Sequence, residues 1–179
     1  MASAKQDQDI VIQITRNFET MDVSLSKLEE LAKTVCNRFA GRGTAQARYE
    51  VSIAIVDDSE IRQLNAQFLG HKTTTDCLSF DLSDDEESEI TDQKSKIFEL
   101  IVNGEMAVRQ ADLRGHSSEA ELALYITHGL LHNLGFDDQT SDQARTMHDT
   151  EDEILQQMGY GFVYNRNVRA QGHESTENP

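Results

Sequence analysis

The residues of this sequence best suited to chemistry are two histidines, His128 and His132, and an aspartate that follows them, Asp138. Histidines four positions apart on a helix project from one face, so a nitrogen from each can reach the same ion at about 2.0–2.1 Å. Gly135 can take the left-handed conformation that ends a helix, and Asp138 can then turn back toward that ion. Two histidines and a carboxylate are a familiar catalytic zinc set with one position open for water. The pattern predicts a site for one divalent metal ion, which we expect to be zinc.

The residues around the motif support a metal site, with Asp138 as the expected third ligand. Apolar residues cover nearly all sides of the helix between 122 and 134, where an unpaired imidazole would cost about 1–3 kcal/mol. Asp137 competes with Asp138 for this position, and its other predicted roles are a carboxylate of the loop or helix cap, or a partner that orients one of the histidines. Gly129 stands where zinc peptidases of the HExxH type carry their general-base glutamate. We therefore expect room for substrate beside the ion, and a hydrolase that does not work as such a peptidase does.

The elements that must position these residues are strands early in the chain and helices late. Apolar–polar alternation predicts strands, and apolar residues at helical spacing predict helices. The expected strands are 10–15, 49–56, 77–82 and 97–102, with further β structure at 106–108, and the expected helices are 24–39, 57–70, 118–134 and 140–159. This order predicts the α+β class: a single domain over 10–160, with a mixed β-sheet packed against helices.

Two capping signals mark the starts of the later helices. Ser118 and Glu121 have the spacing of a capping box, in which each side chain pairs with a backbone N–H at the helix start. Thr140 and Gln143 repeat that spacing before the last helix.

Polar segments flank and interrupt the predicted domain. The segments 1–9 and 165–179 are expected to be flexible tails. The strongly acidic segment 83–96 is expected to be a solvated surface loop.

The composition restricts the partners and the compartment. The 179 residues include 16 basic and 32 acidic ones, and the net charge of −16 opposes non-specific binding to nucleic acid while leaving a local basic cleft possible. Cys36 and Cys77 form no CxxC pair, and the start of the chain lacks the apolar core of a signal peptide. No stretch reaches the roughly 18 apolar residues of a membrane span. We expect a cytoplasmic protein with reduced thiols and no membrane association, whose oligomeric state the sequence leaves open.

The histidine segment resembles the characteristic motif of the YbeY family, the metal-dependent endoribonucleases and ribosomal RNA maturation factors of bacteria. Residues 128–138, His-Gly-Leu-Leu-His-Asn-Leu-Gly-Phe-Asp-Asp, follow the family's His-Gly-x-Leu-His-x-x-Gly-Tyr-Asp-His, with Asp138 in place of the last histidine. Other segments that resemble the family are Leu64-Asn65, Thr75-Asp76-Cys77-Leu78-Ser79-Phe80, Gly104-Glu105-Met106, and Met147 with Glu151.

The resemblance implies an α+β fold with three metal ligands in a cleft. It also implies hydrolysis of single-stranded RNA in small-subunit ribosomal RNA processing and ribosome quality control, with RNA or the small ribosomal subunit as partner. By matching position, His128 and His132 take ligand roles and Asp138 takes the third. A carboxylate there weakens the ion as a Lewis acid and favours harder metals such as Mn²⁺.

The sequence departs from the family at a basic position. The family carries an arginine shortly before its Thr-Asp-Val-Leu-Ser-Phe strand, and that position is Leu69 here, while the family's proline falls at Thr74. The basic residues that could contact phosphate instead are His71, Lys72, Arg62, Arg109 and Arg114.

Three functions follow from these observations. The first is a metal-dependent endoribonuclease of ribosomal RNA processing. The second is a zinc-dependent hydrolase of another substrate such as peptide, against which the missing glutamate at Gly129 argues. The third is a non-catalytic ribosome-assembly factor with a structural metal, which the net charge of −16 and Leu69 support.

Overall fold

The computed structural model describes residues 9–39, 48–83 and 95–164. The segment expected to be a tail at 165–179, and nearly all of the segments 1–9 and 83–96, lie outside these residues. No helix among the described residues is long and apolar enough to cross a membrane.

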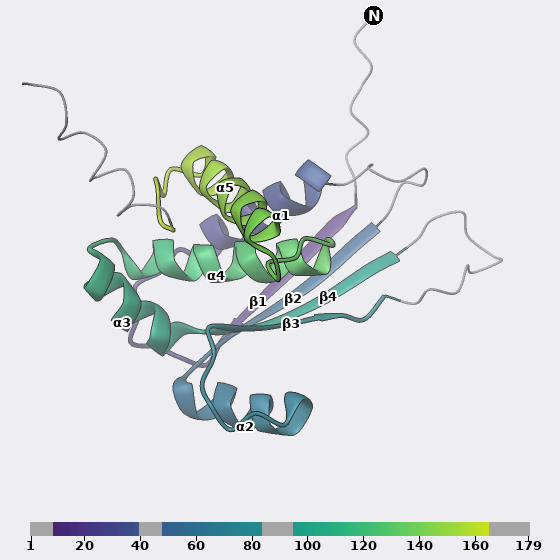
Figure 1. Ribbon diagram of the computed structural model, residues 1–179. Coiled ribbons are helices and arrows are strands. Elements are labelled where there is room, and N and C mark those ends of the chain that lie inside the picture. Colours follow the sequence, from purple (N-terminus) through teal and green to yellow (C-terminus); the bar gives the residue numbers. More distant parts are fainter. Residues whose placement is uncertain (1–8, 40–47, 84–94, 165–179) are drawn as a thin grey trace, which may run out of the picture.

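Four strands and five helices make up the described residues (Figure 1). They are β1 (Ile10–Arg16), α1 (Leu25–Phe39), β2 (Arg48–Val56), α2 (Asp58–Leu69), β3 (Cys77–Asp81), β4 (Ser95–Asn103), α3 (Gly104–Arg114), α4 (Ser118–Asn133) and α5 (Ser141–Gln157). The sheet has the order β1-β2-β4-β3, in which β1, β2 and β4 run parallel and β3 runs antiparallel to β4. The predicted α+β class with a mixed sheet is confirmed.

The helices cover the two faces of the sheet unequally. Helices α1, α4 and α5 lie over one face, and α2 lies on the other (Figure 1). The larger apolar core lies between α4 and the sheet, where side chains such as Ile53, Leu100 and Leu130 are no more than 1% exposed. A smaller core of Val56, Ile61, Leu78 and Ile101 lies under α2. The histidine helix is thus held on the sheet by the main core.

The predicted β structure at 106–108 is wrong, because these residues belong to α3. Asn103 ends β4 and caps the helix, and its side-chain oxygen accepts a hydrogen bond from the backbone N–H of Met106 at 2.9 Å. The Asn103 amide also donates to Asp58 and to the Thr75 carbonyl, so a buried polar network fixes this turn. A short apolar run fits a strand as well as a buried helix, and here the Asn103 cap favours the helix.

One of the two predicted capping boxes is present. Thr140 and Gln143 form it at the start of α5, as predicted. At α4 the cap is Ser117, which accepts from the N–H of Ala120 at 3.1 Å, so the predicted pairing of Ser118 with Glu121 is wrong. The buried Glu121 carboxylate instead accepts a hydrogen bond from Arg114, the last residue of α3, and lies within hydrogen-bond distance of His116.

Candidate metal centre

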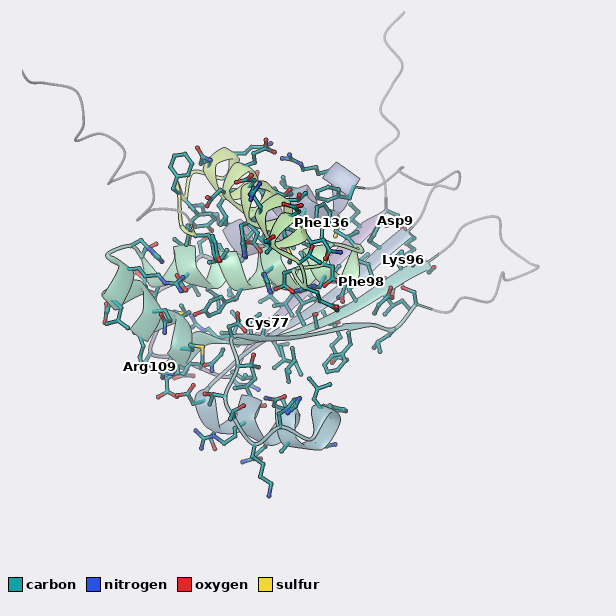
Figure 2. The ribbon with its side chains drawn as sticks, in the orientation of Figure 1. Asp9, Cys77, Lys96, Phe98, Arg109 and Phe136 are labelled. Carbon is teal, nitrogen blue, oxygen red and sulfur yellow. The ribbon has the colours of Figure 1, made fainter. Side chains whose placement is uncertain are left out.

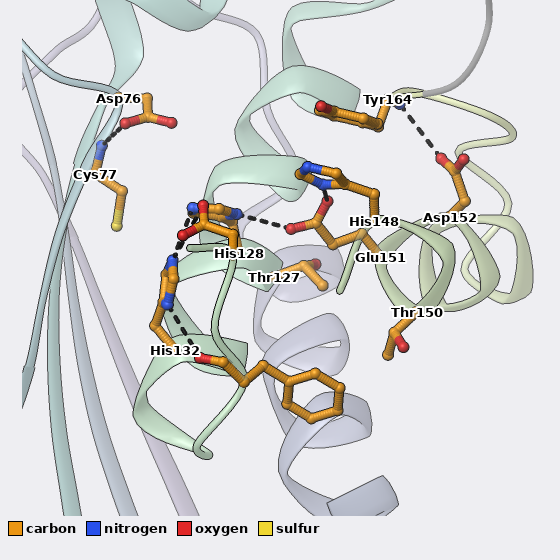
Figure 3. A network of polar contacts seen from close by, with 12 residues as sticks. Asp76, Cys77, Thr127, His128, His132, His148, Thr150, Glu151, Asp152 and Tyr164 are labelled. Carbon is orange, nitrogen blue, oxygen red and sulfur yellow. Dashed lines mark hydrogen bonds and ion pairs between the residues drawn. The ribbon is translucent and has the colours of Figure 1, made fainter. Parts of the chain in front are cut away.

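Helix α4 brings the two predicted histidines together at its partly exposed edge. The side chains of His128 and His132 are 25% and 31% exposed. Their Nε2 atoms are 3.1 Å apart and their rings stand at 89° to each other (Figure 3). The two imidazoles therefore converge on one point from one face of the helix.

The end of α4 turns the chain back toward this point. Gly135 has a φ of 91°, the left-handed conformation predicted for it, and its N–H donates to the His132 carbonyl at 3.0 Å. The N–H of Phe136 donates to the Leu131 carbonyl at 2.9 Å, which completes a Schellman cap. Asp138 follows, with its Oδ2 atom 4.0 Å from Nε2 of His132.

The three predicted residues lie close enough together to form a candidate set of metal ligands. One atom from each of His128, His132 and Asp138 lies within 4.8 Å of the other two. Ligands 2.0–2.2 Å from a tetrahedral ion lie about 3.4 Å apart, so small side-chain movements would close the set around one ion. Asp137 lies outside this group, and its carboxylate accepts the backbone N–H of Asp138 at 2.8 Å. Two imidazoles and a carboxylate fit a divalent transition metal with one position open.

Both histidines have the outer ring nitrogen engaged by an acceptor. His128 Nδ1 lies 2.8 Å from Oε1 of Glu151, and His132 Nδ1 lies 3.2 Å from the Phe136 carbonyl oxygen. An acceptor at Nδ1 places the proton there and leaves the lone pair on Nε2, the nitrogen that faces the site. The surrounding chain therefore prepares both imidazoles to bind an ion through Nε2.

Glu151 is the functional residue to which the sequence assigned no role. It is fully buried on α5, and its second oxygen lies 2.8 Å from Nδ1 of His148, whose ring stacks on Tyr164 (Figure 3). Burial alone would lower the pKa of His128, but the hydrogen bond and charge of Glu151 raise it above the ordinary value. Burial likewise opposes ionisation of Glu151, and its hydrogen bonds to the two histidines lower its pKa. The sequence feature that could have identified Glu151 is a glutamate at an otherwise apolar position of the last helix.

Gly129 does not leave room beside the ion, contrary to expectation. A Cβ atom at this position would lie 2.8 Å from Sγ of Cys77 and 3.0 Å from Cδ2 of Leu100, side chains of β3 and β4. The glycine thus allows α4 to pack closely on the sheet. Burial raises the pKa of the Cys77 thiol well above its ordinary value, which favours the protonated thiol at neutral pH.

Two of the candidate phosphate contacts are already engaged by carboxylates. Arg109 donates two hydrogen bonds to Asp58, at 2.7 and 3.1 Å, on the side of the molecule near α2 (Figure 2). Arg114 donates to the buried Glu121 at 2.9 Å. Leu69, which the resemblance places at the family's arginine, is 53% exposed at the end of α2.

The other candidates lie on or beyond α2. Arg62 belongs to that helix, and His71 and Lys72 are exposed in the segment between α2 and β3.

Comparison with known proteins identifies relatives over most of the chain. The profile of the family described as Endoribonuclease YbeY matches residues 13–159. A protein named Endoribonuclease YbeY from Bacillus velezensis is 33% identical over 146 residues, which cover 79% of this chain and 92% of the relative. A relative of the same name from Geobacillus thermodenitrificans is 33% identical over 154 residues, which cover 84% of this chain and 98% of the relative.

A solved structure shares the fold. The solution structure of a Thermotoga maritima protein aligns with a TM-score of 0.51 at 22% identity, covering 93% of this chain and 97% of that one. At this identity the likeness concerns the fold alone. The relatives by sequence carry the assignment of the chain to an enzyme family, which confirms the predicted resemblance: this chain belongs to the endoribonuclease YbeY family.

Proposed function

We propose that this chain is a metal-dependent endoribonuclease that cleaves single-stranded RNA during ribosomal RNA processing. The observation that carries the chemistry is the convergence of two Nε2 atoms and one Asp138 carboxylate oxygen at a partly exposed helix edge. The family name of the relatives supports RNA as the substrate. It favours neither a peptide hydrolase nor a non-catalytic assembly factor.

His128, His132 and Asp138 are the proposed ligands, and zinc is the proposed ion. A zinc ion bound by them would supply a Lewis acid and bring the pKa of a water to about 7, suitable for attack on a phosphodiester. Asp138 adds a negative charge that the family's histidine lacks, so Mn²⁺ is the competing ion. Both imidazoles would bind the ion through Nε2, because Glu151 and the Phe136 carbonyl engage the opposite nitrogens.

The charge distribution bears on how RNA is held. With a net charge of −16, the protein gains little from long-range attraction to phosphates. Arg109 and Arg114 are paired with Asp58 and Glu121, which further reduces the available positive charge. We propose that the small ribosomal subunit presents the RNA, and that the protein works in the cytoplasm, where its unpaired cysteines stay reduced.

The test combines metal content with cleavage. Protein purified without chelators should hold one zinc ion per chain, and His132→Ala and Asp138→Ala should each lose it by elemental analysis. The wild type should cleave a labelled single-stranded ribosomal RNA fragment, lose activity on chelation and regain it with Zn²⁺ or Mn²⁺. His132→Ala should be inactive while its circular dichroism matches the wild type.

Other outcomes separate the alternatives. Cleavage of a peptide panel without cleavage of RNA would replace the proposed substrate. A metal-loaded protein that cleaves neither substrate and still binds the small subunit would make the protein an assembly factor. Retention of the ion by Asp138→Ala would move the third ligand to Asp137 or to a ligand from outside the chain.

A further inference from the structure

The face of the sheet opposite the metal centre carries an apolar groove. Its volume is about 420 Å³, and it runs between α2 and the outer face of β2, β3 and β4. The apolar side chains that line it include Ala54, Leu64, Phe68, Phe80, Leu82 and Ile101. Helix α2 covers only one end of this sheet face (Figure 1).

Large apolar side chains are exposed along this groove and the adjoining sheet. Phe68 is 54% exposed and its ring meets Phe80 edge to face at 5.5 Å, while Leu82 is 52% exposed at the far end. Val11 and Ile97 lie in one row across the same face, both in register with Glu50, and are 36% and 38% exposed. Among the described residues, four of the seven exposed large apolar side chains therefore gather here.

The strand directions make this exposure unusual. Strands β1, β2 and β4 are parallel, and parallel strands normally have both faces covered. The face toward α4 meets this expectation, whereas among the described residues the helix that packs on the outer face is the 12-residue α2. The described residues thus leave part of the outer face without a second layer, which a partner could supply.

The negative charges in the groove indicate that the partner carries basic residues. Glu60 of α2 and Glu99 of β4 both contribute to its walls. The side chain of Glu99 is exposed and has no ion pair or hydrogen bond with another described residue. The Glu60 carboxylate accepts one long hydrogen bond of 3.4 Å, from the side chain of Asn17. An apolar floor between unneutralised carboxylates matches a helix with one apolar face bordered by lysine or arginine. We propose that this groove binds a basic amphipathic helix of a partner protein.

The test uses a synthetic helical peptide of about 18 residues, five turns, with leucine on one face and lysine on the other. Binding of the labelled peptide to the full chain is followed by fluorescence anisotropy. Two matched peptides have the same composition in scrambled order, or glutamate in place of lysine. Only the first peptide should bind well, and its affinity should fall as salt rises.

Variants of the protein locate the binding site. Phe68→Ser and Glu99→Lys should each weaken binding by about tenfold or more, without changing the fold because both side chains are exposed. Leu113→Ser should leave binding unchanged, since Leu113 is 79% exposed on α3 outside the groove. His132→Ala should also bind as the wild type does, because the metal centre lies across the sheet.

Several results would overturn the proposal. Equal binding of the scrambled peptide, or full binding by Phe68→Ser, would reduce the interaction to attraction by net charge. Equal binding of the glutamate peptide would remove the role of Glu60 and Glu99. A dimer in light scattering that Phe68→Ser abolishes would make a second copy of this chain the occupant.

Discussion

The Nδ1 atom of His128 lies 2.8 Å from Oε1 of the fully buried Glu151, which joins α4 to α5 directly behind the candidate metal centre. Glu151 therefore acts as a positioning residue: it orients the imidazole and fixes which nitrogen carries the proton. Because its other oxygen meets His148, the carboxylate itself cannot rotate freely.

Glu151→Gln should weaken metal binding by about 10–100-fold, the usual effect of losing a carboxylate that orients a ligating histidine. A glutamine keeps the volume but presents an amide that can donate toward Nδ1, which favours the wrong tautomer. Competition with a chromogenic zinc chelator measures the affinity directly, independent of any activity on RNA.

The matched control is Glu121→Gln, another fully buried glutamate that is held by a histidine and an arginine. It should lower stability in urea unfolding and leave zinc affinity within about twofold of wild type. Equal losses of affinity in both variants would mean that Glu151 acts only through general stability.

The same hydrogen bond predicts the pH dependence of metal binding. Glu151 raises the pKa of His128 despite the opposing effect of burial, so a proton competes with the metal for this imidazole at higher pH than usual. Zinc affinity should rise with pH through the raised pKa and level off above it. In Glu151→Gln the plateau should begin at lower pH, which ¹⁵N chemical shifts of His128 can follow. Identical profiles for both proteins would contradict this.

The contribution of His128 to the stability of the metal-free protein should change with pH in the direction opposite to zinc affinity. Since the folded pKa of His128 is raised, the pair with Glu151 stabilises the fold fully below the unfolded histidine pKa of about 6.5. That contribution is lost as pH rises through the folded value. The lowered pKa of Glu151 adds stability that is present above the unfolded glutamate pKa and lost as pH falls through the folded one. Urea unfolding across this range, compared with Glu151→Gln, measures both effects.

A histidine at position 138 should change the choice of metal. Asp138→His replaces a charged oxygen ligand with a neutral nitrogen, so preference for Zn²⁺ over Mn²⁺ should increase by about tenfold or more. Asp138→Ala should lose the ion, and Asp137→Ala should keep it, because Asp137 lies outside the ligand group. Competitive loading with both metals followed by elemental analysis distinguishes these results. Unchanged preference in Asp138→His would show that this side chain does not bind the ion.

The sequence located the histidines and Asp138 because all three lie within one helix and its cap. Helical spacing and the left-handed Gly135 are local properties, and local geometry alone brings these side chains together. Glu151 is 23 residues from His128 along the chain, and only the packing of α5 on α4 shows that they meet. The same limit applies to the outer groove, where α2 and β4 meet only in the folded chain.

The wrong predictions have a related cause. The run at 106–108 suits a strand or a helix, and the cap by Asn103, which depends on contacts with Asp58 and Thr75, selects the helix. The pattern on α4 showed that Gly129 is next to His128 but could not show that β3 and β4 fill the space beside it.

Gly129→Ala should therefore destabilise the fold, although alanine is the better helix former. Its Cβ would lie 2.8 Å from Cys77 Sγ and 3.0 Å from Leu100 Cδ2, so α4 must move away from the sheet or the side chains must shift. Overpacking of this kind costs about 1–3 kcal/mol, measurable by urea unfolding. Cys77→Ala removes the sulfur atom that makes the closest contact, so the double variant should recover part of the loss as a favourable coupling. If the two changes are additive, the contact with Cys77 is not the reason for glycine at this position, and the Leu100 contact would have to account for the whole effect.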